Sequence, residues 1–170
     1  PHAVQNKIYK EFYFENFLSV FKSTFHLERA GGTHKFCWHD MEYRSFMMDM
    51  LRNLEPRLLQ ANQILFKELD DINEVLFVQK GVVDIGYQLN EKKHFVLRCK
   101  DKTLIGAYNC TFNIRIIFTY KAKTQCQGYS IRKVNWLGIL REYREIGALI
   151  EKNVERDYLE NIKEKVMREK

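Results

Sequence analysis

Residues 106 to 124, GAYNCTFNIRIIFTYKAKT, combine the residue types that proteins use to bind a phosphate group. A glycine turn at Gly106 precedes a short stretch with helical character, and a β-branched stretch follows with Arg115 near its start. Backbone N–H groups in the first turn of a helix and a nearby guanidinium both stabilise a buried phosphate. The segment therefore has the layout of a phosphate pocket, with Arg115 as its one arginine.

The rest of the chain lacks the residue patterns of catalysis and of metal binding. It contains no nucleophile elbow, no Walker loop and no HExxH helix. Three histidines fall in or near an expected loop, without a CxxC pair to complete a metal site: His26, His34 and His39. The four cysteines are predicted to be free thiols: Cys37, Cys99, Cys110 and Cys126. We therefore expect no enzyme activity, no catalytic residue and no metal site.

Both ends of the chain are expected to be helical. Residues 3 to 27 repeat apolar side chains every four or five positions, at Val4, Ile8, Phe12, Phe17, Phe21 and Phe25. A second helix should begin at Asp40, a favourable N-cap, and bury Phe46, Met47, Met50, Leu51 and Leu54. Near the C-terminus an i, i+4 ladder runs through Ile146, Ile150, Val154, Tyr158, Ile162 and Val166. Helices this apolar on one face need another element to cover it.

Between these ends the sequence changes to short β-branched and aromatic runs separated by polar turns. Such runs, with Gly81 and Gly86 among them, predict about eight short antiparallel strands in a β-roll or jelly roll. The expected fold class is α+β, with helices on both sides of the roll in sequence. We predict linker-like helices over 1–57, a β-roll that carries the phosphate pocket over 58–133, and C-terminal helices over 134–170.

The net charge of +6 is concentrated in one part of the sequence. Residues 92 to 133 contain ten basic side chains and one acidic side chain, Asp101. This basic cluster, from Lys92 to Lys133, predicts an anionic partner, either a lipid surface or an acidic protein face. No run approaches the ~18 apolar residues that a membrane span requires. The chain begins without a methionine and ends in a charged helical pattern, and we interpret it as part of a longer protein.

Residues 58 to 143 resemble a cyclic nucleotide-binding homology domain of the kind attached to voltage-gated cation channels. The run LQANQILFKELDDINEVLFVQKGVVDIGY resembles the family's two strands closed by FxxxGxV, with Phe77, Gly81 and Val83 at the motif positions. LIGAYNC resembles its FGE turn, YKAKTQCQGYSI its VRAxTYCxLYSL strand pair, and WLGILREY the start of its next helix. The resemblance implies a β-roll whose pocket is built for cAMP or cGMP.

The N-terminal stretch PHAVQNKIYKEF resembles the first helix of the C-linker, which joins a channel's last transmembrane helix to this domain. This similarity implies a regulatory domain on the cytoplasmic face of a plasma, ciliary or flagellar membrane. Its partners would be the transmembrane part of its own parent chain and further copies, through the N-terminal helices. Sperm-type sodium/proton exchangers resemble channels in carrying a voltage sensor and a similar domain, and are an alternative parent.

Two other functions stay open beside a membrane transport protein. The chain could act as a kinase-regulatory module, although such modules normally carry a complete pocket, or as an oligomerisation module. Bacterial relatives of the family place a helix-turn-helix after the barrel, and no such motif follows here, so we expect no nucleic-acid partner.

Compared with the family motif, the pocket has lost the groups that contact a nucleotide. Gly106 is retained and Tyr108 follows it, but Ala107 replaces the glutamate that accepts a hydrogen bond from the ribose 2′-OH. Ile116 replaces the arginine, and Ile117 stands where a small hydroxyl residue is usual. Loss of the charged partner of a buried phosphate costs about 2–5 kcal/mol. The resemblance therefore predicts a degenerate pocket that binds cAMP and cGMP weakly or not at all, and no bound cofactor.

The one arginine that remains is not expected to replace the missing one. Side chains alternate between the two faces of a strand, so Arg115 should point away from the direction of Ile116. Residues 116 to 118 are expected to be core residues of that strand.

Channels of the ether-à-go-go type fill a degenerate pocket with a short segment of their own tail. Tyr158, Leu159 and Glu160 supply the aromatic, aliphatic and acidic groups that such a plug would need. Tyr158 also belongs to the ladder of the last helix, so packing is the alternative role. The family's positively charged residue that covers the base falls near Glu160, which again argues against a nucleotide.

Overall fold

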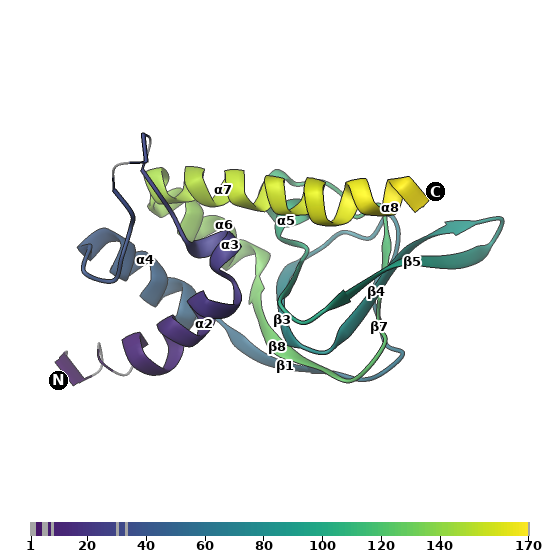
Figure 1. The fold of residues 1–170 in the computed structure, drawn as a ribbon, viewed down its shortest axis with the longest axis horizontal. Coiled ribbons are helices and arrows are strands. Elements are labelled where there is room, and N and C mark those ends of the chain that lie inside the picture. Colours follow the sequence, from purple (N-terminus) through teal and green to yellow (C-terminus); the bar gives the residue numbers. More distant parts are fainter. Residues whose placement is uncertain (1–2, 5–6, 8, 30, 33, 170) are drawn as a thin grey trace.

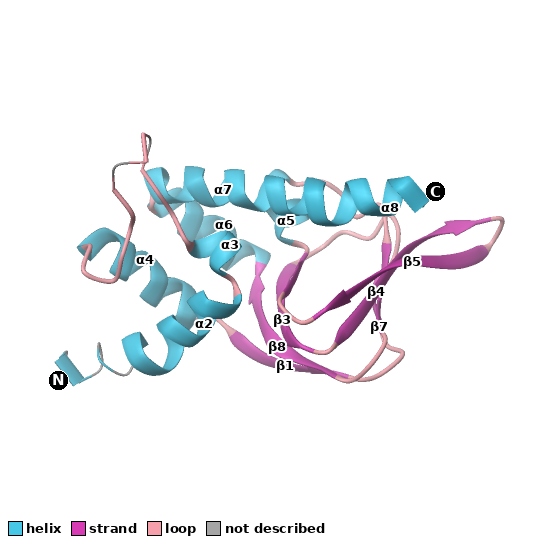
Figure 2. Cartoon of the chain, viewed as in Figure 1, coloured by secondary structure: helices cyan, strands magenta, loops and turns pink. Residues whose placement is uncertain are grey.

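The computed structural model describes residues 3–4, 7, 9–29, 31–32 and 34–169. Within these residues, helices come first, eight strands follow with one short helix between the sixth and the seventh, and further helices close the chain (Figure 1). The strands form one body, and the helices gather along one side and one end of it (Figure 2). The expected α+β fold, an antiparallel β-roll flanked by helices, is confirmed.

Two antiparallel sheets of four strands each form the roll, in the orders β1-β8-β3-β6 and β2-β7-β4-β5. Their strands are β1 (Glu55–Leu59), β2 (Ile64–Phe66), β3 (Glu74–Lys80), β4 (Val82–Leu89), β5 (Lys92–Lys100), β6 (Thr103–Ile105), β7 (Thr119–Ala122) and β8 (Cys126–Arg132). The β4–β5 hairpin projects beyond the rest of the roll (Figure 1).

Strand β3 runs through the centre of the molecule. Residues 75 to 78 are all buried, because one face of β3 meets the interior of the roll and the other is covered by helices. The turn from β3 to β4 depends on Gly81, whose φ is +115°. A Cβ there would lie 2.8 Å from the Cα of Cys126, so a larger residue would push β8 away.

The N-terminal aromatic stripe is covered by the protein's own sheet. It lies on η1 (Tyr9–Phe14), a π-helical turn, α2 (Glu15–Val20) and α3 (Lys22–Phe25). The rings of Phe17, Phe21 and Phe25 surround that of Phe77, on β3, at centroid distances of 5.1, 5.1 and 5.9 Å. Aromatic pairs at this spacing contribute about 0.5–1.5 kcal/mol each beyond the area they bury. The stripe therefore anchors the N-terminal helices to the roll.

The single helix expected over 3–27 is interrupted. Phe21 has φ −113° and ψ 35°, which ends α2 and lets α3 turn so that rings on both sides of the break reach Phe77. Val4 was expected on the buried stripe but is exposed. Ile8 and the side chain of Phe12 lie outside what the structure describes.

The second predicted helix is α4 (Met41–Arg52), and Asp40 stands at its N-cap position. Its carboxylate does not bond to the helix but accepts a hydrogen bond of 2.9 Å from the backbone N–H of Cys37, which lowers the pKa of Asp40. The predicted inner face is confirmed, with the last two side chains half-buried: Phe46, Met47, Met50, Leu51 and Leu54.

The chain ends in α6 (Lys133–Glu142), α7 (Arg144–Tyr158), η2 (Leu159–Lys163) and α8 (Glu164–Glu169). All members of the predicted ladder are buried: Ile146, Ile150, Val154, Tyr158, Ile162 and Val166. The axis from α7 to α8 lies along the whole molecule, from the N-terminal helices to the roll (Figure 1). In the described part of the chain, no helix has both the length and the apolar character to cross a membrane.

The boundary predicted between residues 57 and 58 falls inside β1. Residues 55 to 57 are polar or proline and give no strand signal, yet they pair with residues 128 to 130 of β8. Helix α6 begins at Lys133, one residue before the predicted start of the C-terminal helices.

Candidate functional site

The phosphate-pocket segment, called the cassette below, comprises β6, Gly106, α5 (Ala107–Phe112), a loop and β7. Gly106 has φ +84°, and a Cβ there would lie 2.9 Å from the carbonyl oxygen of Glu74. Only glycine adopts this backbone without strain in so little space. The turn from strand to helix is therefore intact, although the polar groups around it differ from those of the family.

The predicted pocket positions differ from one another in how deeply they are buried. Ala107 is buried at the start of α5, and Ile116, at the position of the missing arginine, is 1% exposed. Ile117 is 40% exposed, so the expectation that it belongs to the core is wrong. Residues 113 to 118 form a loop rather than a strand, and β7 begins only at Thr119. In this loop Ile116 and Phe118 turn inward and Ile117 turns outward.

Arg115 lies outside the pocket. Its Nε is 3.2 Å from Oδ1 of Asp71, and both side chains are largely exposed, at 66% and 74%. An exposed ion pair of this kind is worth about 0–1 kcal/mol, so it does not hold the arginine firmly. The guanidinium nevertheless has no part in the buried face of the cassette, where Ile116 lies.

Two stacked tyrosines join α7 to the cassette. The rings of Tyr108, on α5, and Tyr158, at the end of α7, are stacked with centroids 4.2 Å apart and planes 9° from parallel. Tyr158 is 6% exposed. The cavity left between α5 and α7 is about 10 Å³, and Tyr120 on β7 forms another part of its wall. One water molecule would fill such a space.

Of the three residues predicted as a plug, Tyr158 lines this cavity. Leu159 is half-buried and Glu160 exposed on η2, and the carboxylate at the cavity wall belongs to Asp157. Burial raises the pKa of the Asp157 carboxyl, although the side-chain amide of Asn161 donates a 3.0 Å hydrogen bond to it. Burial also raises the pKa of the Tyr158 phenol to about 12, with Tyr108 adding to the effect. This end of α7 is thus apolar and poorly suited to an anion.

Helix α5 is held from a second side by α6. The indole Nε1 of Trp136 donates a 2.9 Å hydrogen bond to Oγ1 of Thr111, and Trp136 is fully buried. The Cys110 thiol lies beneath α5 beside the carbonyl oxygens of Ile72 and Glu74, and burial raises its pKa to about 12. The cassette helix is therefore fixed between α6, α7 and β3. Sequence analysis did not link these residues, because they are far apart along the chain.

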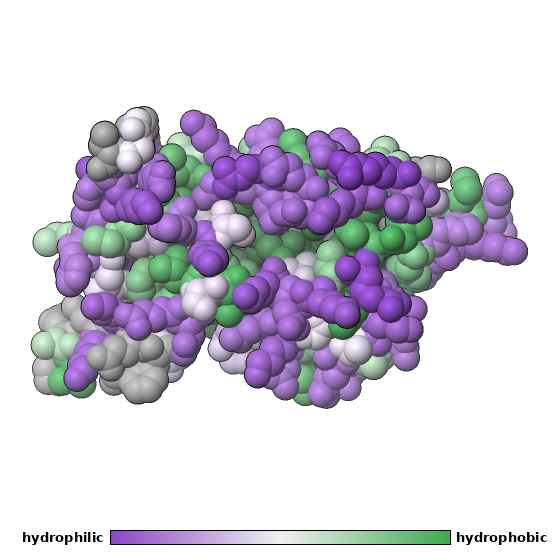
Figure 3. Space-filling view, viewed as in Figure 1, coloured by the Kyte–Doolittle hydropathy of each residue, from purple (hydrophilic) through white to green (hydrophobic). Residues whose placement is uncertain are grey.

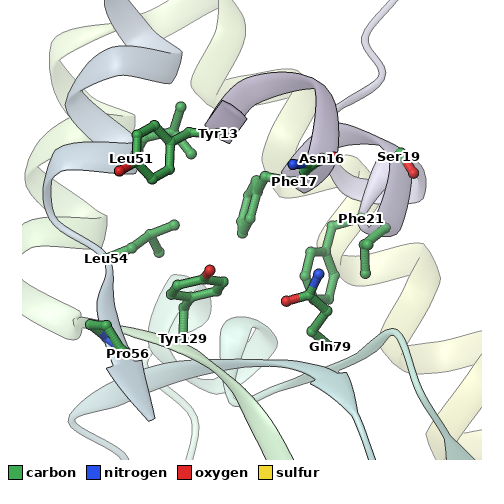
Figure 4. A pocket seen from close by; sticks show the side chains of 11 residues that line it. Tyr13, Asn16, Phe17, Ser19, Phe21, Leu51, Leu54, Pro56, Gln79 and Tyr129 are labelled. Carbon is green, nitrogen blue, oxygen red and sulfur yellow. The ribbon is translucent and has the colours of Figure 1, made fainter. Parts of the chain in front are cut away.

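A larger cavity lies elsewhere, at the junction between α2, the end of α4 and the sheet. This seam cavity has a volume of about 350 Å³ (Figure 4). Phe17 and Tyr129 point toward its middle, and Leu51 and Leu54 form one wall (Figure 4). Sequence analysis missed it, since its residues belong to six separate helices and strands.

No protein-family model matches the sequence, and no curated protein matches it by sequence. Solved structures match it by fold. A cyclic nucleotide-binding domain from Methylobacillus flagellatus KT has a TM-score of 0.70 and 12% identity, over 92% of this chain and 82% of that one. The regulatory domain of Toxoplasma gondii PKA, solved with cAMP, has a TM-score of 0.59 and 12% identity, over 85% of this chain and 48% of that one.

A third neighbour is the regulatory subunit of a cAMP-independent protein kinase A from Trypanosoma cruzi, bound to guanosine. It has a TM-score of 0.57 and 10% identity, over 71% of this chain and 43% of that one. This chain thus spans about half the length of the two kinase regulatory proteins. At these identities the comparisons show that the chain has the fold of cyclic nucleotide-binding domains, and that the named neighbours are regulatory or binding domains.

Proposed function

We propose that this chain is the regulatory domain of a voltage-sensing ion channel, with a nucleotide pocket closed by its own C-terminal helix. In this proposal the domain binds cAMP and cGMP weakly or not at all, and the packing of α7 on the cassette replaces the ligand. The observation that carries the proposal is the Tyr108–Tyr158 stack, which leaves a cavity of about 10 Å³ where a nucleotide would need several hundred.

The contacts of α7 support a role in transmitting movement. Near its middle, the side-chain amide of Asn153 donates a 3.0 Å hydrogen bond to the carbonyl oxygen of Thr24 on α3. Just before α7 begins, the Tyr143 hydroxyl donates a 2.7 Å hydrogen bond to the carboxylate of Asp49 on α4. Its end holds Tyr158 against the cassette. One helix therefore contacts both the pocket and the N-terminal helices that would face the channel, so displacing it would alter both.

Restoring the family's pocket tests this proposal. Tyr158→Ala alone removes the stack but supplies no charge, so cAMP should still bind poorly. Adding Ala107→Glu and Ile116→Arg should strengthen cAMP binding by about 30-fold or more over Tyr158→Ala, because the arginine regains a buried phosphate partner. Titration calorimetry of the single and triple variants measures the difference.

The matched control carries the same arginine one residue further on. Ile117→Arg, combined with Ala107→Glu and Tyr158→Ala, adds an equal charge at an exposed position and should give no gain. Circular dichroism of each variant checks that it folds. If the control binds cAMP as well as the restored variant does, the cassette does not determine binding and the proposal fails.

The parent protein is tested separately, by voltage clamp of cells that express the full-length protein. A channel gives ionic current whose activation voltage shifts in Tyr158→Ala. The alternative parent, a voltage-sensing sodium/proton exchanger regulated by cAMP, would give sodium-dependent proton flux instead.

A kinase-regulatory module is the second alternative, and two neighbours favour it because they are regulatory parts of protein kinases. Co-purification of an active kinase that the chain inhibits would support it and exclude the channel. An oligomerisation module is less well supported, because the aromatic stripe that would form the contact is buried on β3. Copies could still associate through the outer side of these helices, where Tyr13 is exposed.

A further inference from the structure

The outer face of sheet β2-β7-β4-β5 concentrates the positive charge of the roll. Side chains alternate along a strand, and the register aligns Asp84 with Arg98 on one side and with Lys121 on the other. The guanidinium Nε of Arg98 donates a 2.9 Å hydrogen bond to Asp84, and the Lys121 ammonium lies 4.7 Å from the centre of the Phe95 ring. These contacts place all four side chains on the same, outward face.

Strand alternation and register add further cations to this basic face, which we define as Lys93, Arg98, Lys100, Lys121 and Lys123. Asp84 is the one acidic residue in these four strands, and Arg98 neutralises it. At the margin, the Glu68 carboxylate accepts a hydrogen bond from the backbone N–H of Gln88. The face therefore keeps a clear excess of positive charge, and the described residues show no carboxylate bonded to its four lysines.

The β4–β5 hairpin extends this face beyond the roll. Hydrophilic residues cover most of the surface of this hairpin (Figure 3). At its end Leu89 and Lys92 pair across the hairpin, and strand alternation places both side chains on the side opposite to Lys93, so Leu89, which is 51% exposed, does not belong to the basic face. Glu91, in the turn, is the one acidic residue there. The ammonium groups of the basic face would therefore meet lipid phosphates through charge alone, without an apolar anchor.

We propose that the basic face binds the surface of a membrane that contains anionic lipids. Four of the five cations are lysines, which act as flexible point charges and suit a diffuse layer of negative charge. Recognition of a specific acidic peptide would favour arginine forks. The inference uses side chains that do not line the cavity of the cassette, so it stands or falls separately from the proposal on nucleotide binding.

Co-sedimentation with vesicles tests the proposal. The folded chain should bind vesicles of phosphatidylcholine with 30% phosphatidylserine (about one anionic lipid in three) much better than pure phosphatidylcholine, and binding should fall as salt is raised. The variant Lys93→Gln/Lys100→Gln/Lys123→Gln should bind about 100-fold more weakly, since each lysine near an anionic surface contributes roughly fivefold. Leu89→Ser changes an exposed side chain on the opposite side of the hairpin and should leave binding within about threefold of that of the unmodified chain.

The matched control removes the same charge from the helical end of the molecule, with Lys22→Gln/Lys35→Gln/Lys152→Gln. These lysines are exposed and lie on α3, after it, and on α7. The control should bind anionic vesicles within about threefold of the unmodified chain. Equal losses in the two triple variants would show that net charge alone drives binding, and would overturn the proposal.

Competition with a soluble acidic polypeptide distinguishes a membrane from an acidic protein as the partner of the basic face. Polyglutamate should compete weakly with the vesicles, because a flexible chain does not present a continuous layer of negative charge to the whole face. Tight binding of polyglutamate without vesicle binding would assign the face to an acidic protein and overturn the membrane proposal. Either result leaves the cAMP titrations of the cassette variants unchanged, so the two proposals fail independently.

Discussion

The cassette and the seam cavity differ in the room that they offer: the first encloses about 10 Å³ and the second about 350 Å³. The cassette keeps the backbone of a ligand pocket, including the positive φ of Gly106, but its interior holds Tyr158. No motif in the sequence predicted the seam cavity. Aromatic rings and leucines nevertheless surround an open space there.

The difference shows that an intact strand–glycine–helix backbone does not by itself leave room for a ligand. The buried side chain of Ile116 offers no charge to an anion, whereas an apolar ring suits such surroundings. Tyr158 and Tyr108 supply that ring pair. The backbone persists because Gly106, Trp136 and Cys110 pack the cassette against its neighbours independently of any ligand.

The largest expected effect is at Phe77 on β3, which packs against Phe17 and Phe21 of the seam cavity. Phe77→Ala removes the ring that three N-terminal phenylalanines and Trp136 contact, and should lower the free energy of unfolding by about 3–5 kcal/mol. Urea denaturation measures it. Leu89→Ala, at an exposed position, is the control and should change stability by less than about 0.5 kcal/mol. A loss below 1 kcal/mol for Phe77→Ala would mean that the N-terminal helices are not anchored on the roll.

Breaking the tyrosine stack should cost somewhat less. Tyr158→Ala is expected to lower the free energy of unfolding by about 2–4 kcal/mol, because it empties a buried site. Tyr158→Phe keeps the ring and should cost less than about 1 kcal/mol. A double-mutant cycle with Tyr108→Ala should give a coupling of about 0.5–1.5 kcal/mol. Zero coupling would show that the two rings do not stabilise each other in solution.

Adding volume tests the comparison from the opposite direction. Ala107→Val places two methyl groups in the filled cassette and should cost about 1–3 kcal/mol. Val20→Leu adds one carbon at the wall of the seam cavity and should change stability by less than about 0.5 kcal/mol, because the space is open. Thermal unfolding of the two variants gives the result. The contrast between the regions is wrong if Val20→Leu proves the more costly.

The smallest effect concerns Asp157 and depends on pH. Its pKa is raised above the usual 3.8 in the folded protein, mainly by burial. Ionisation is therefore harder in the folded than in the unfolded state, and the carboxylate lowers stability once the pH exceeds 3.8. Asp157→Asn should raise the free energy of unfolding at pH 7 by up to about 1 kcal/mol, which thermal unfolding detects as a higher melting temperature. The gain should vanish near pH 3. A gain that is equal at both pH values would exclude the carboxyl as its cause.

The sequence predicted the fold well because the spacing of hydrophobic residues along helices and strands can be read from a single chain. The ladder from Ile146 to Val166 and the alternating runs of the strands reported which faces are buried. The partners of those faces were not predictable in the same way. Tyr108 and Tyr158 each stood out, but their stacking depends on how α7 crosses the cassette, which no local pattern encodes.

Local geometry was also harder to predict than burial. Residues 114 to 118, IRIIF, have the composition of a strand but form a loop, because their backbone bonds to the segment that contains Leu69 and Asp70 instead of extending β7. The outward direction expected for Arg115 agrees with its pairing to Asp71, although the reason is the loop and not strand alternation.

Titration calorimetry of the unmodified chain with cAMP and cGMP, up to millimolar nucleotide, tests the central claim most directly. The account predicts no measurable heat of binding, because Ile116 offers no charge to the phosphate and Tyr158 fills the site. Binding at micromolar strength would contradict it, since Tyr158 would then have to leave the cassette and another cation, such as Arg115, would have to reach the phosphate.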